Sequence, residues 1–303
     1  MKHASGKLWR LIPVLLLSGC GGAGNFSTTG SLNVGVTDAP VDGVTQVVVD
    51  FTKVQVHSAD GTTKDIILPS SQQVDLLAMS NGQQGMLLEN QPLEAGFYDW
   101  VRLFVNESSS STYVIDSVGN QHALQIPSDA QTGLKINHSF ALPQGGVARF
   151  VIDFDLRKSL HLPQGANQPY LLRPTLRMVD ATTTGGISGT VDAALVADGT
   201  CTDALNTSGA AGGSVYLWSG AGATPVDIDS TQIAGQPLTT AAVKTDGNGK
   251  WGYTAAFLAP GTYTVAFTCQ SWKDLPDSAE TLVFLGAANV TVTSGNTATH
   301  DFQ

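Results

Sequence analysis

The chain has 303 residues, and its 25 acidic and 15 basic side chains give a formal net charge of −10. This acidity disfavours nucleic acid and anionic lipid head groups as partners. Only 13% of the residues are charged and 33 are Gly, a composition typical of a secreted all-β protein rather than a helical cytosolic one. The length favours two domains over one.

Residues 1–19 have the pattern of a signal peptide. Three basic residues precede an apolar segment, residues 11–17, that is too short to span a bilayer as a stable helix. The segment ends in Leu17-Ser18-Gly19-Cys20, which resembles the lipobox of bacterial lipoproteins. The resemblance implies that the Cys20 thiol takes a diacylglyceryl group and becomes the mature N-terminus. The alternative is conventional cleavage that leaves Cys20 as an ordinary residue.

Residues 20–30 predict a short flexible tether between the lipid and the first domain. The run from Gly21 to Gly30 buries no apolar surface. Gly21, rather than Asp, follows Cys20, a pattern similar to that of Gram-negative lipoproteins sent to the outer membrane. We therefore predict a lipid-anchored protein of the cell envelope. Its anchor binds the membrane, and it faces the periplasm or the cell surface if the host is Gram-negative.

Alternation of apolar and polar residues predicts a β-sandwich domain over residues 31–180. Turn signals such as Asp60-Gly61 and Gly119-Asn120 separate its strands. Residues 74–79 predict a short helical turn, and no long amphipathic helix is expected. The predicted strands are residues 32–36, 44–56, 64–68, 98–105, 113–118, 123–126, 135–142, 147–156 and 170–179.

Residues 181–186, ATTTGG, predict a linker to a second β-sandwich over residues 187–303. Asp246-Gly247-Asn248-Gly249 is interpreted as a hairpin turn, because the later ligands of a calcium-binding loop are absent. The predicted strands are residues 187–191, 215–218, 225–228, 241–245, 250–257, 262–269, 281–285 and 289–292.

Two cysteines, Cys201 and Cys269, remain as an even pair if Cys20 carries lipid. Alternation in residues 262–269 places Tyr263, Val265, Phe267 and Cys269 on one inward face. In an oxidising compartment this pattern favours a Cys201–Cys269 disulfide. Two separate buried thiols are the alternative, and a metal site is less favoured because neither Cys has a second ligand at the required spacing.

Several segments carry resemblances to known families. VTDAP at 36–40, IPSDAQTGLKI at 126–136 and FVIDFDLRKSL at 150–160, followed by LLRPTLR at 171–177, together resemble the bacterial lipoprotein family catalogued as domain of unknown function 4382. That family has no assigned activity. Residues 187–302 resemble the carboxypeptidase regulatory-like domains with a transthyretin-like sandwich, through the segments 187–191, 246–249 and 259–263. This second resemblance implies an accessory module, and some relatives of that sandwich bind glycans.

Four charged residues, Arg149, Asp153, Asp155 and Arg157, share one face if residues 147–156 form a continuous strand. The two carboxylates would then stand about 7 Å apart, a separation that suits a Ca²⁺ ion or an acid and base for glycoside cleavage. The favoured interpretation is a cross-strand charge ladder that also includes arginines of neighbouring strands. Those arginines are Arg102, Arg173 and Arg177.

The second domain is rich in aromatic residues. Trp218, Trp251 and Trp272, with Tyr253, offer indole and phenol rings on which sugars stack, although in a small sandwich most such rings belong to the core. In the first domain, Asp38 precedes Ala39-Pro40, a position where a carboxylate commonly accepts backbone N–H groups.

The chain contains no serine elbow, zinc-binding helix motif or phosphate loop, and its six His residues are scattered. We therefore predict a non-catalytic binding or scaffolding protein, with a glycan, a peptide or a partner envelope protein as ligand. The alternatives are an envelope hydrolase or calcium-dependent binding module that uses Asp153 and Asp155, and a purely structural spacer. No cofactor other than Ca²⁺ is considered.

Overall fold

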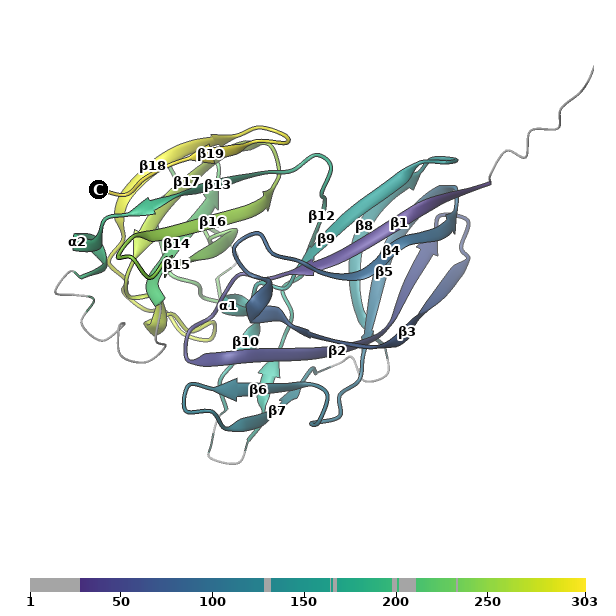
Figure 1. Cartoon of the computed structure of the whole chain (residues 1–303), viewed down its shortest axis with the longest axis horizontal. Helices are drawn as coiled ribbons and strands as arrows, with labels where there is room; N and C mark the ends of the chain where they lie inside the picture. Colours follow the sequence, from purple (N-terminus) through teal and green to yellow (C-terminus); the bar gives the residue numbers. More distant parts are fainter. Residues whose placement is uncertain are drawn as a thin grey trace, which may run out of the picture.

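The structure, a computed structural model, describes residues 28–127, 132–163, 165, 168–197, 201, 211–232 and 234–303. It is all-β, with two domains side by side in an elongated molecule (Figure 1). The predicted signal peptide, Cys20 and residues 21–27 of the predicted tether lie outside the described residues. Thr29 and Gly30, predicted as the end of the tether, instead begin the first β-strand. Within the described ranges, no helix is both long enough and apolar enough to cross a membrane.

The first domain packs two sheets face to face. The smaller sheet has the order β12-β9-β1-β4, formed by β12 (Arg177–Asp180), β9 (Val147–Asp153), β1 (Thr29–Thr37) and β4 (Gly85–Glu94). The larger has the order β10-β11-β7-β6-β2-β5-β8, with β3 paired to β2. Its strands are β10 (Leu160–His161), β11 (Tyr170–Leu172), β7 (Gln121–Gln125), β6 (Tyr113–Asp116), β2 (Val44–Ser58), β5 (Gly96–Val105), β8 (Leu134–Leu142) and β3 (Thr63–Asp75).

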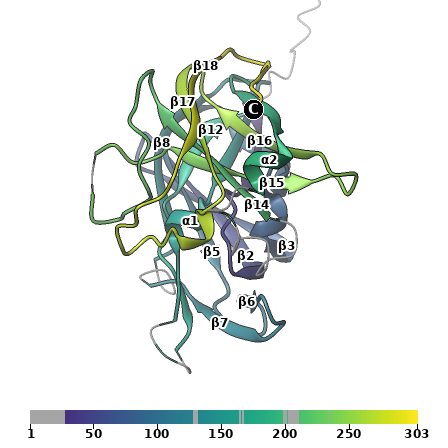
Figure 2. The same cartoon turned by 90° about the vertical axis from the view of Figure 1, so that its left-hand side faces the viewer.

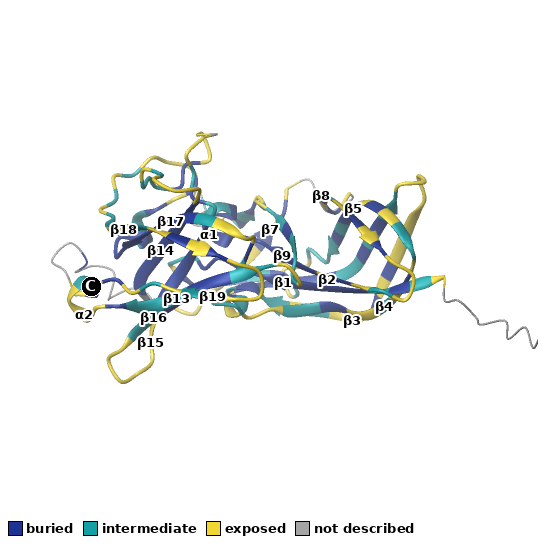
Figure 3. Ribbon diagram, turned by 90° about the horizontal axis from the view of Figure 1, so that it is seen from above, coloured by how far each residue is buried: buried dark blue, intermediate teal, exposed yellow. Residues whose placement is uncertain are grey.

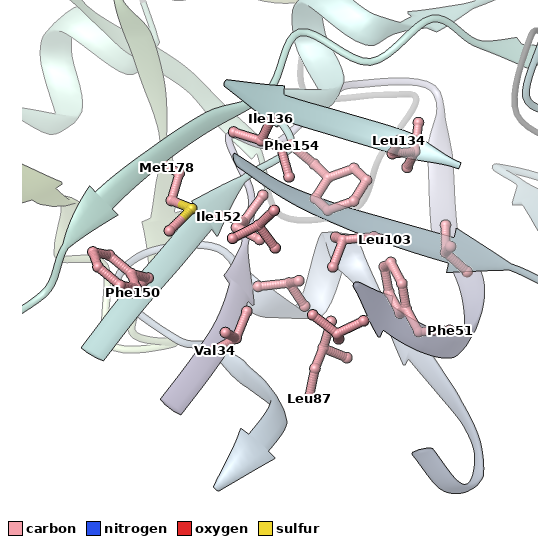
Figure 4. Packing of buried hydrophobic residues seen from close by; sticks show 14 of the residues in the cluster. Val34, Phe51, Leu87, Leu103, Leu134, Ile136, Phe150, Ile152, Phe154 and Met178 are labelled. Atoms are coloured by element: carbon pink, nitrogen blue, oxygen red, sulfur yellow. The ribbon is translucent and has the colours of Figure 1, made fainter. Parts of the chain in front are cut away.

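The core of the first domain lies between these two sheets (Figure 4). Val34 from the smaller sheet and Phe51 from the larger are both fully buried, and Phe51 packs edge to face with Phe154 at 5.8 Å between ring centroids. Each such side chain contributes about 1.5–3 kcal/mol by leaving water. The predicted helical turn is the 3₁₀-helix η1 (Leu76–Met79), which follows β3.

Proline residues account for two departures from the predicted strands. The predicted strand 170–179 is divided into β11 and β12, which join different sheets, and Pro174 between them has no N–H to offer a ladder. Strand β4 was not predicted, because Asn90 and Pro92 interrupt its apolar residues. It lies at the edge of its sheet, where a proline is tolerated.

The second domain is a single seven-stranded sheet with the order β18-β17-β14-β15-β16-β13-β19. Strand β18 also lies close to β13 and β19, so the sheet curls around its core. Its strands are β18 (Leu285–Val292), β17 (Gly261–Thr268), β14 (Ala211–Ser219), β15 (Thr239–Thr245), β16 (Trp251–Leu258), β13 (Gly185–Val191) and β19 (Thr297–Thr299). Among the described residues it also contains the short helices α2 (Ala193–Val196) and η4 (Ser271–Lys273). Figure 2 shows these strands from the second-domain end.

Strands β14 and β17 are buried on both faces (Figure 3). Val215 faces the curled core, whereas Tyr216 and Trp218 face a second cluster that includes Ile228 and Phe284. The predicted strands 225–228 and 281–285 are therefore wrong, apart from Leu285 at the start of β18. Their apolar side chains instead cover the outer face of β14 and β17.

The predicted disulfide between Cys201 and Cys269 is confirmed. Cys269 directly follows β17, and the inward face predicted for this strand is correct, because Tyr263, Val265 and Phe267 belong with both cysteines to the curled core. The bond closes a loop across a sequence separation of 68 residues.

Removing this disulfide should destabilise the protein. We expect Cys201→Ser/Cys269→Ser to lower the free energy of unfolding by about 4 kcal/mol, within a usual range of about 2–5, because the unfolded chain regains the entropy of the closed loop. Urea denaturation of the soluble form, residues 25–303, measures this change. Equal stability of the two proteins would contradict it.

Candidate functional site at the domain junction

Arg157 is buried between the two domains. It lies on the short helix α1 (Leu156–Ser159), and its side chain is 1% exposed. One guanidinium nitrogen donates to the Ser271 carbonyl at 2.7 Å, and the other to the Asp42 carboxylate at 2.9 Å and the Ser214 hydroxyl at 3.2 Å. Asp42 belongs to the first domain, while Ser214 and Ser271 belong to the second. A single cation is thus shared by both domains.

The local backbone explains why Arg157 reaches this position. Strand β9 ends at Asp153, and Asp155 adopts a left-handed conformation with φ of 43°, which turns the chain out of the sheet and into α1. The Leu156 N–H then donates to the Asp38 carboxylate at 2.8 Å. Asp38 therefore accepts a backbone N–H, as predicted for this residue type, but from a segment 118 residues away rather than from its own turn.

This turn corrects the predicted charge ladder. The continuous strand over 147–156 is wrong, so Asp155 and Arg157 do not share a strand face with Arg149, which is exposed on β9. Asp153 does form a cross-strand ion pair, with Arg177 of β12 at 2.8 Å. The other cations that were assigned to the ladder lie elsewhere. Arg173 approaches Asp277 at 4.0 Å, and Arg102 lies near Gln55 on the outer face of the first domain.

Other cations of the first domain also reach the second. Lys158 pairs with Asp155 at 2.7 Å and donates to the Leu238 carbonyl at 2.6 Å. Arg177 pairs with Asp153 and also donates to the Phe257 carbonyl at 2.9 Å. These contacts repeat the pattern of Arg157, in which each cation neutralises a carboxylate of its own domain and donates to the backbone of the other.

A pocket of about 700 Å³ opens beside these ion pairs. The first domain lines it with Asp153, Asp155, Lys158 and Arg177. The second lines it with the buried Trp218 and with residues after β14, at 223–226 and 234–238. Burial raises the pKa of Asp155, an effect that the neighbouring Lys158 opposes. The two carboxylates proposed as an acid and base or as calcium ligands therefore each lie against a cation in the wall of this pocket.

Behind Arg157, the second domain contributes a phenol and a carboxylate. The guanidinium carbon lies 5.9 Å from the centre of the Tyr216 ring, and the Tyr216 hydroxyl donates to Asp274 at 2.5 Å. Asp274 also accepts the Ile228 N–H at 3.0 Å. Burial raises the pKa of Asp274 to about 6, although Arg157 and these hydrogen bonds act in the opposite direction.

The tryptophans proposed for sugar stacking do not offer three open rings. Trp218 is 2% exposed and packs against Phe284 with 5.4 Å between centroids, so the prediction for Trp218 is wrong. Trp251 is half-buried against the curled core, and Trp272 is half-buried beside Lys273. The burial of Trp218 follows from the covering of the second face of β14, which the sequence pattern alone did not reveal.

Sequence reasoning missed two groups of side chains. Trp100 on the outer face of the first domain stacks on His57 with 4.7 Å between centroids, and the Arg102 guanidinium lies 4.7 Å from its ring. The signal that could have found this group is the alternation of residues 98–105, which places Trp100 and Arg102 on the same face of the strand. The second group is an acidic cluster whose carboxylate oxygens lie within 4.8 Å of one another, formed by Asp227, Asp274 and Glu280.

Comparison with protein families gives a match over the first domain. Residues 29–174 match the family model described as a domain of unknown function, DUF4382. The predicted family of the first domain is confirmed, whereas the resemblance of the second domain to carboxypeptidase regulatory-like domains stays a prediction. No curated protein sequence matches the chain.

Among solved structures, the chain is similar to a minor pilin of Streptococcus agalactiae, with 12% identity, 90% of this chain and 94% of that chain covered, and a TM-score of 0.21. The major pilin subunit of Bacillus cereus gives 11% identity, coverage of 90% and 98%, and a TM-score of 0.20. A fimbrial anchor protein of Porphyromonas gingivalis gives 11% identity, coverage of 87% of this chain and 99% of that chain, and a TM-score of 0.18. Likenesses this distant support no argument about fold or function.

Replacing Arg157 should be strongly destabilising. In Arg157→Met the aliphatic volume is kept, but Asp42 loses its cation and the Ser271 carbonyl its donor, so we expect a loss of about 3–5 kcal/mol in the free energy of unfolding. Arg149→Met is the matched control, because Arg149 is exposed and should change stability by less than about 0.5 kcal/mol. Urea denaturation compares the two. If Arg157→Met and Arg149→Met lowered the free energy of unfolding equally, the result would favour the charge ladder over the junction.

Asp274 should make stability fall as the pH rises. Its pKa is near 3.8 in the unfolded chain and about 6 in the folded protein, so its contribution is fully present below pH 4 and is lost as the pH rises through 6. Asp274→Asn, which keeps a neutral side chain, should therefore gain up to about 3 kcal/mol relative to the wild type between pH 4 and 7. Stability measured against pH for both proteins tests this.

Asp246→Asn is the control for that experiment. The N–H groups of Asn248 and Lys250 lower the pKa of this exposed turn carboxylate, so its stabilising contribution is present above pH 4 and is lost as the pH falls. Asp246→Asn should therefore lose stability relative to the wild type at neutral pH, the opposite sign to Asp274→Asn. The same sign for both variants would contradict the role assigned to Asp274.

Proposed function

We propose that this protein is a lipid-anchored component of the cell envelope with a non-catalytic binding or scaffolding role. The observation that carries the proposal is the junction itself, where Arg157, Lys158 and Arg177 of the first domain each bond to the second domain. A protein joined in this way presents its two domains in one fixed arrangement. A fixed arrangement of domains suits a scaffolding or binding protein better than an enzyme whose domains move about a hinge.

The position of the N-terminus supports the anchored part of the proposal. Strand β1 begins at the end of the first domain that points away from the second domain (Figure 1), and the Thr28 carbonyl accepts the Ala95 N–H at 2.9 Å. Thr28 stands eight positions after Cys20, a reach of at most about 28 Å. A lipid on Cys20 would therefore hold the first domain near the membrane and the second domain farther out.

The charges at the junction support a non-catalytic role. Asp153 and Asp155, the residues of the hydrolase alternative, pair with Arg177 and Lys158 at 2.8 and 2.7 Å. A general acid or base must lie within hydrogen-bond reach of the proton that it transfers, whereas each of these carboxylates already bonds to a cation of its own domain. The adjacent pocket of about 700 Å³ has room for a small polar ligand, which is the binding half of the proposal.

The lipid anchor has a direct test in the protein's own host. Cys20→Ser should abolish labelling with a palmitate analogue and move the protein from the membrane to the soluble fraction, because no other residue of the lipobox carries a thiol. Cys201→Ser/Cys269→Ser is the matched control and should keep both the label and the membrane location. Label and membrane location that persist in Cys20→Ser would contradict an anchor at this residue.

A further inference from the structure

The pocket of about 700 Å³ at the junction has walls from both domains. Small-molecule sites typically have volumes of about 300–1,000 Å³ and occur preferentially at domain interfaces. Strand β9 ends beside this pocket with Asp153, β12 begins there with Arg177, and β14 contributes Trp218 just before it ends. A ligand in this pocket would therefore contact both domains at once.

Three residues in the wall of this pocket each carry a polar atom without a hydrogen-bond partner among the described residues. These atoms are Nε1 of Trp218, Nε of Arg177 and Oδ1 of Asp155. Trp218 and Asp155 are each 2% exposed. Buried polar atoms are nearly always satisfied. Two unpartnered donors and one unpartnered carboxyl oxygen around one pocket therefore indicate a bound group that both accepts and donates hydrogen bonds.

A hydroxyl group both accepts and donates. It can accept the N–H of Trp218 or Arg177 and donate to Asp155. Burial raises the pKa of Asp155, and a hydroxyl group would equally accept the proton of a neutral Asp155, so the match does not depend on the charge of that residue. Ser219 and Gln236 also line the pocket, and their neutral polar side chains could bond to further hydroxyl groups of the same ligand.

Charged ligands suit this pocket less well. Its two cations already have carboxylate partners, Arg177 with Asp153 at 2.8 Å and Lys158 with Asp155 at 2.7 Å. A carboxylate or ammonium group on a ligand would compete for one member of a pair. The other member would then lose its counter-ion in a largely buried position, which is costly. A neutral ligand leaves both ion pairs intact.

We propose that this pocket binds a neutral saccharide. The inference rests on the proposed function and names the ligand of its binding half. A saccharide carries several hydroxyl groups on a compact carbon ring, and the wall offers apolar side chains such as Val226 and Leu238 beside its polar atoms. A peptide N–H only donates and a peptide C=O only accepts, so a peptide matches the wall less readily than a sugar, whose hydroxyl groups do both.

This site differs from the sugar-stacking site predicted from the sequence. That prediction required open faces of the tryptophan rings, whereas the ring of Trp218 packs against Phe284. In the proposed site Trp218 contributes only its N–H group. The ligand would be held by hydrogen bonds from both domains, so its binding should stabilise the junction.

Calorimetric titration and thermal melting of the soluble form, residues 25–303, test the proposal. The neutral probes are N-acetylglucosamine, maltose and cellobiose. We expect at least one of them to bind with saturable heat and to raise Tm by several degrees at about a hundredfold its Kd. Saturation separates binding from the general stabilisation that high concentrations of sugars cause.

Charged sugars and a peptide test the class of ligand. Glucosamine carries a positive charge and N-acetylmuramic acid a negative charge on the ring of N-acetylglucosamine, and each should bind about tenfold or more weakly than the best neutral sugar. Saturable binding of a charged sugar or of the blocked dipeptide N-acetyl-alanyl-alanine amide, with no binding of neutral sugars, would overturn the saccharide and leave the proposed binding role standing. No response to any neutral sugar would also overturn the saccharide.

Trp218→Phe tests the position of the site. It keeps an aromatic ring in the core but removes the N–H group, so it should weaken binding of the neutral sugar by about two- to tenfold. Trp272→Phe is the matched control, because Nε1 of Trp272 is also buried without a partner among the described residues but does not line the pocket. It should leave Kd unchanged. Equal weakening by both variants would contradict the site.

Thr224→Trp is a second variant that leaves the core intact. Thr224 is exposed and lines the pocket, so an indole ring at this position should fill the space and abolish sugar binding while Tm without sugar stays near that of the wild type. Sugar binding that persists unchanged in Thr224→Trp would place the sugar elsewhere and overturn the proposal.

Discussion

The arrangement of the two domains depends on one buried guanidinium group. Taking a charged side chain out of water costs several kcal/mol, and good hydrogen-bond geometry must compensate for that cost. Arg157 obtains this compensation from Asp42 on its own domain and from Ser214 and Ser271 on the other. If the domains separated, Arg157 would lose its two partners on the second domain, and the buried surfaces of Tyr216 and α1 would be exposed.

This constraint explains several features that look unrelated in the sequence. The left-handed turn at Asp155 places Arg157 and Lys158 beyond the edge of the sheet, and Asp38 holds the first N–H of α1. Strands β14 and β17 have a second buried face because the first domain and the segments around Ile228 and Phe284 cover it. The VTDAP and DLRKSL segments, which carried the family resemblance, therefore meet in space where the second domain docks.

Much of the fold could be predicted from the sequence. Alternation identified most strands of both domains and the inward face of residues 262–269, and the even cysteine count led to the disulfide. Two features of the first domain could not be predicted, the strand β4 at the edge of its sheet and the division of residues 170–179 at Pro174. Both depend on which sheet a strand joins, and alternation does not show this.

The candidate site was harder to predict than the fold. The charged residues were identified, but placing them on one face assumed a strand that continues to residue 156. The strand ends at Asp153. Partners such as Ser271, Leu238 and Phe257 lie more than 75 residues away in another domain, and no local pattern joins them to Arg157, Lys158 and Arg177. The acidic cluster of Asp227, Asp274 and Glu280 also depends on side chains that only the folded chain brings together.

The most direct test of this account is differential scanning calorimetry of the soluble form, residues 25–303, because it shows whether the two domains unfold together. A junction that depends on a shared buried cation predicts one transition, with equal calorimetric and van't Hoff enthalpies. Two separate transitions in the wild type, each with its own enthalpy, would show that the domains are independent and would contradict the account.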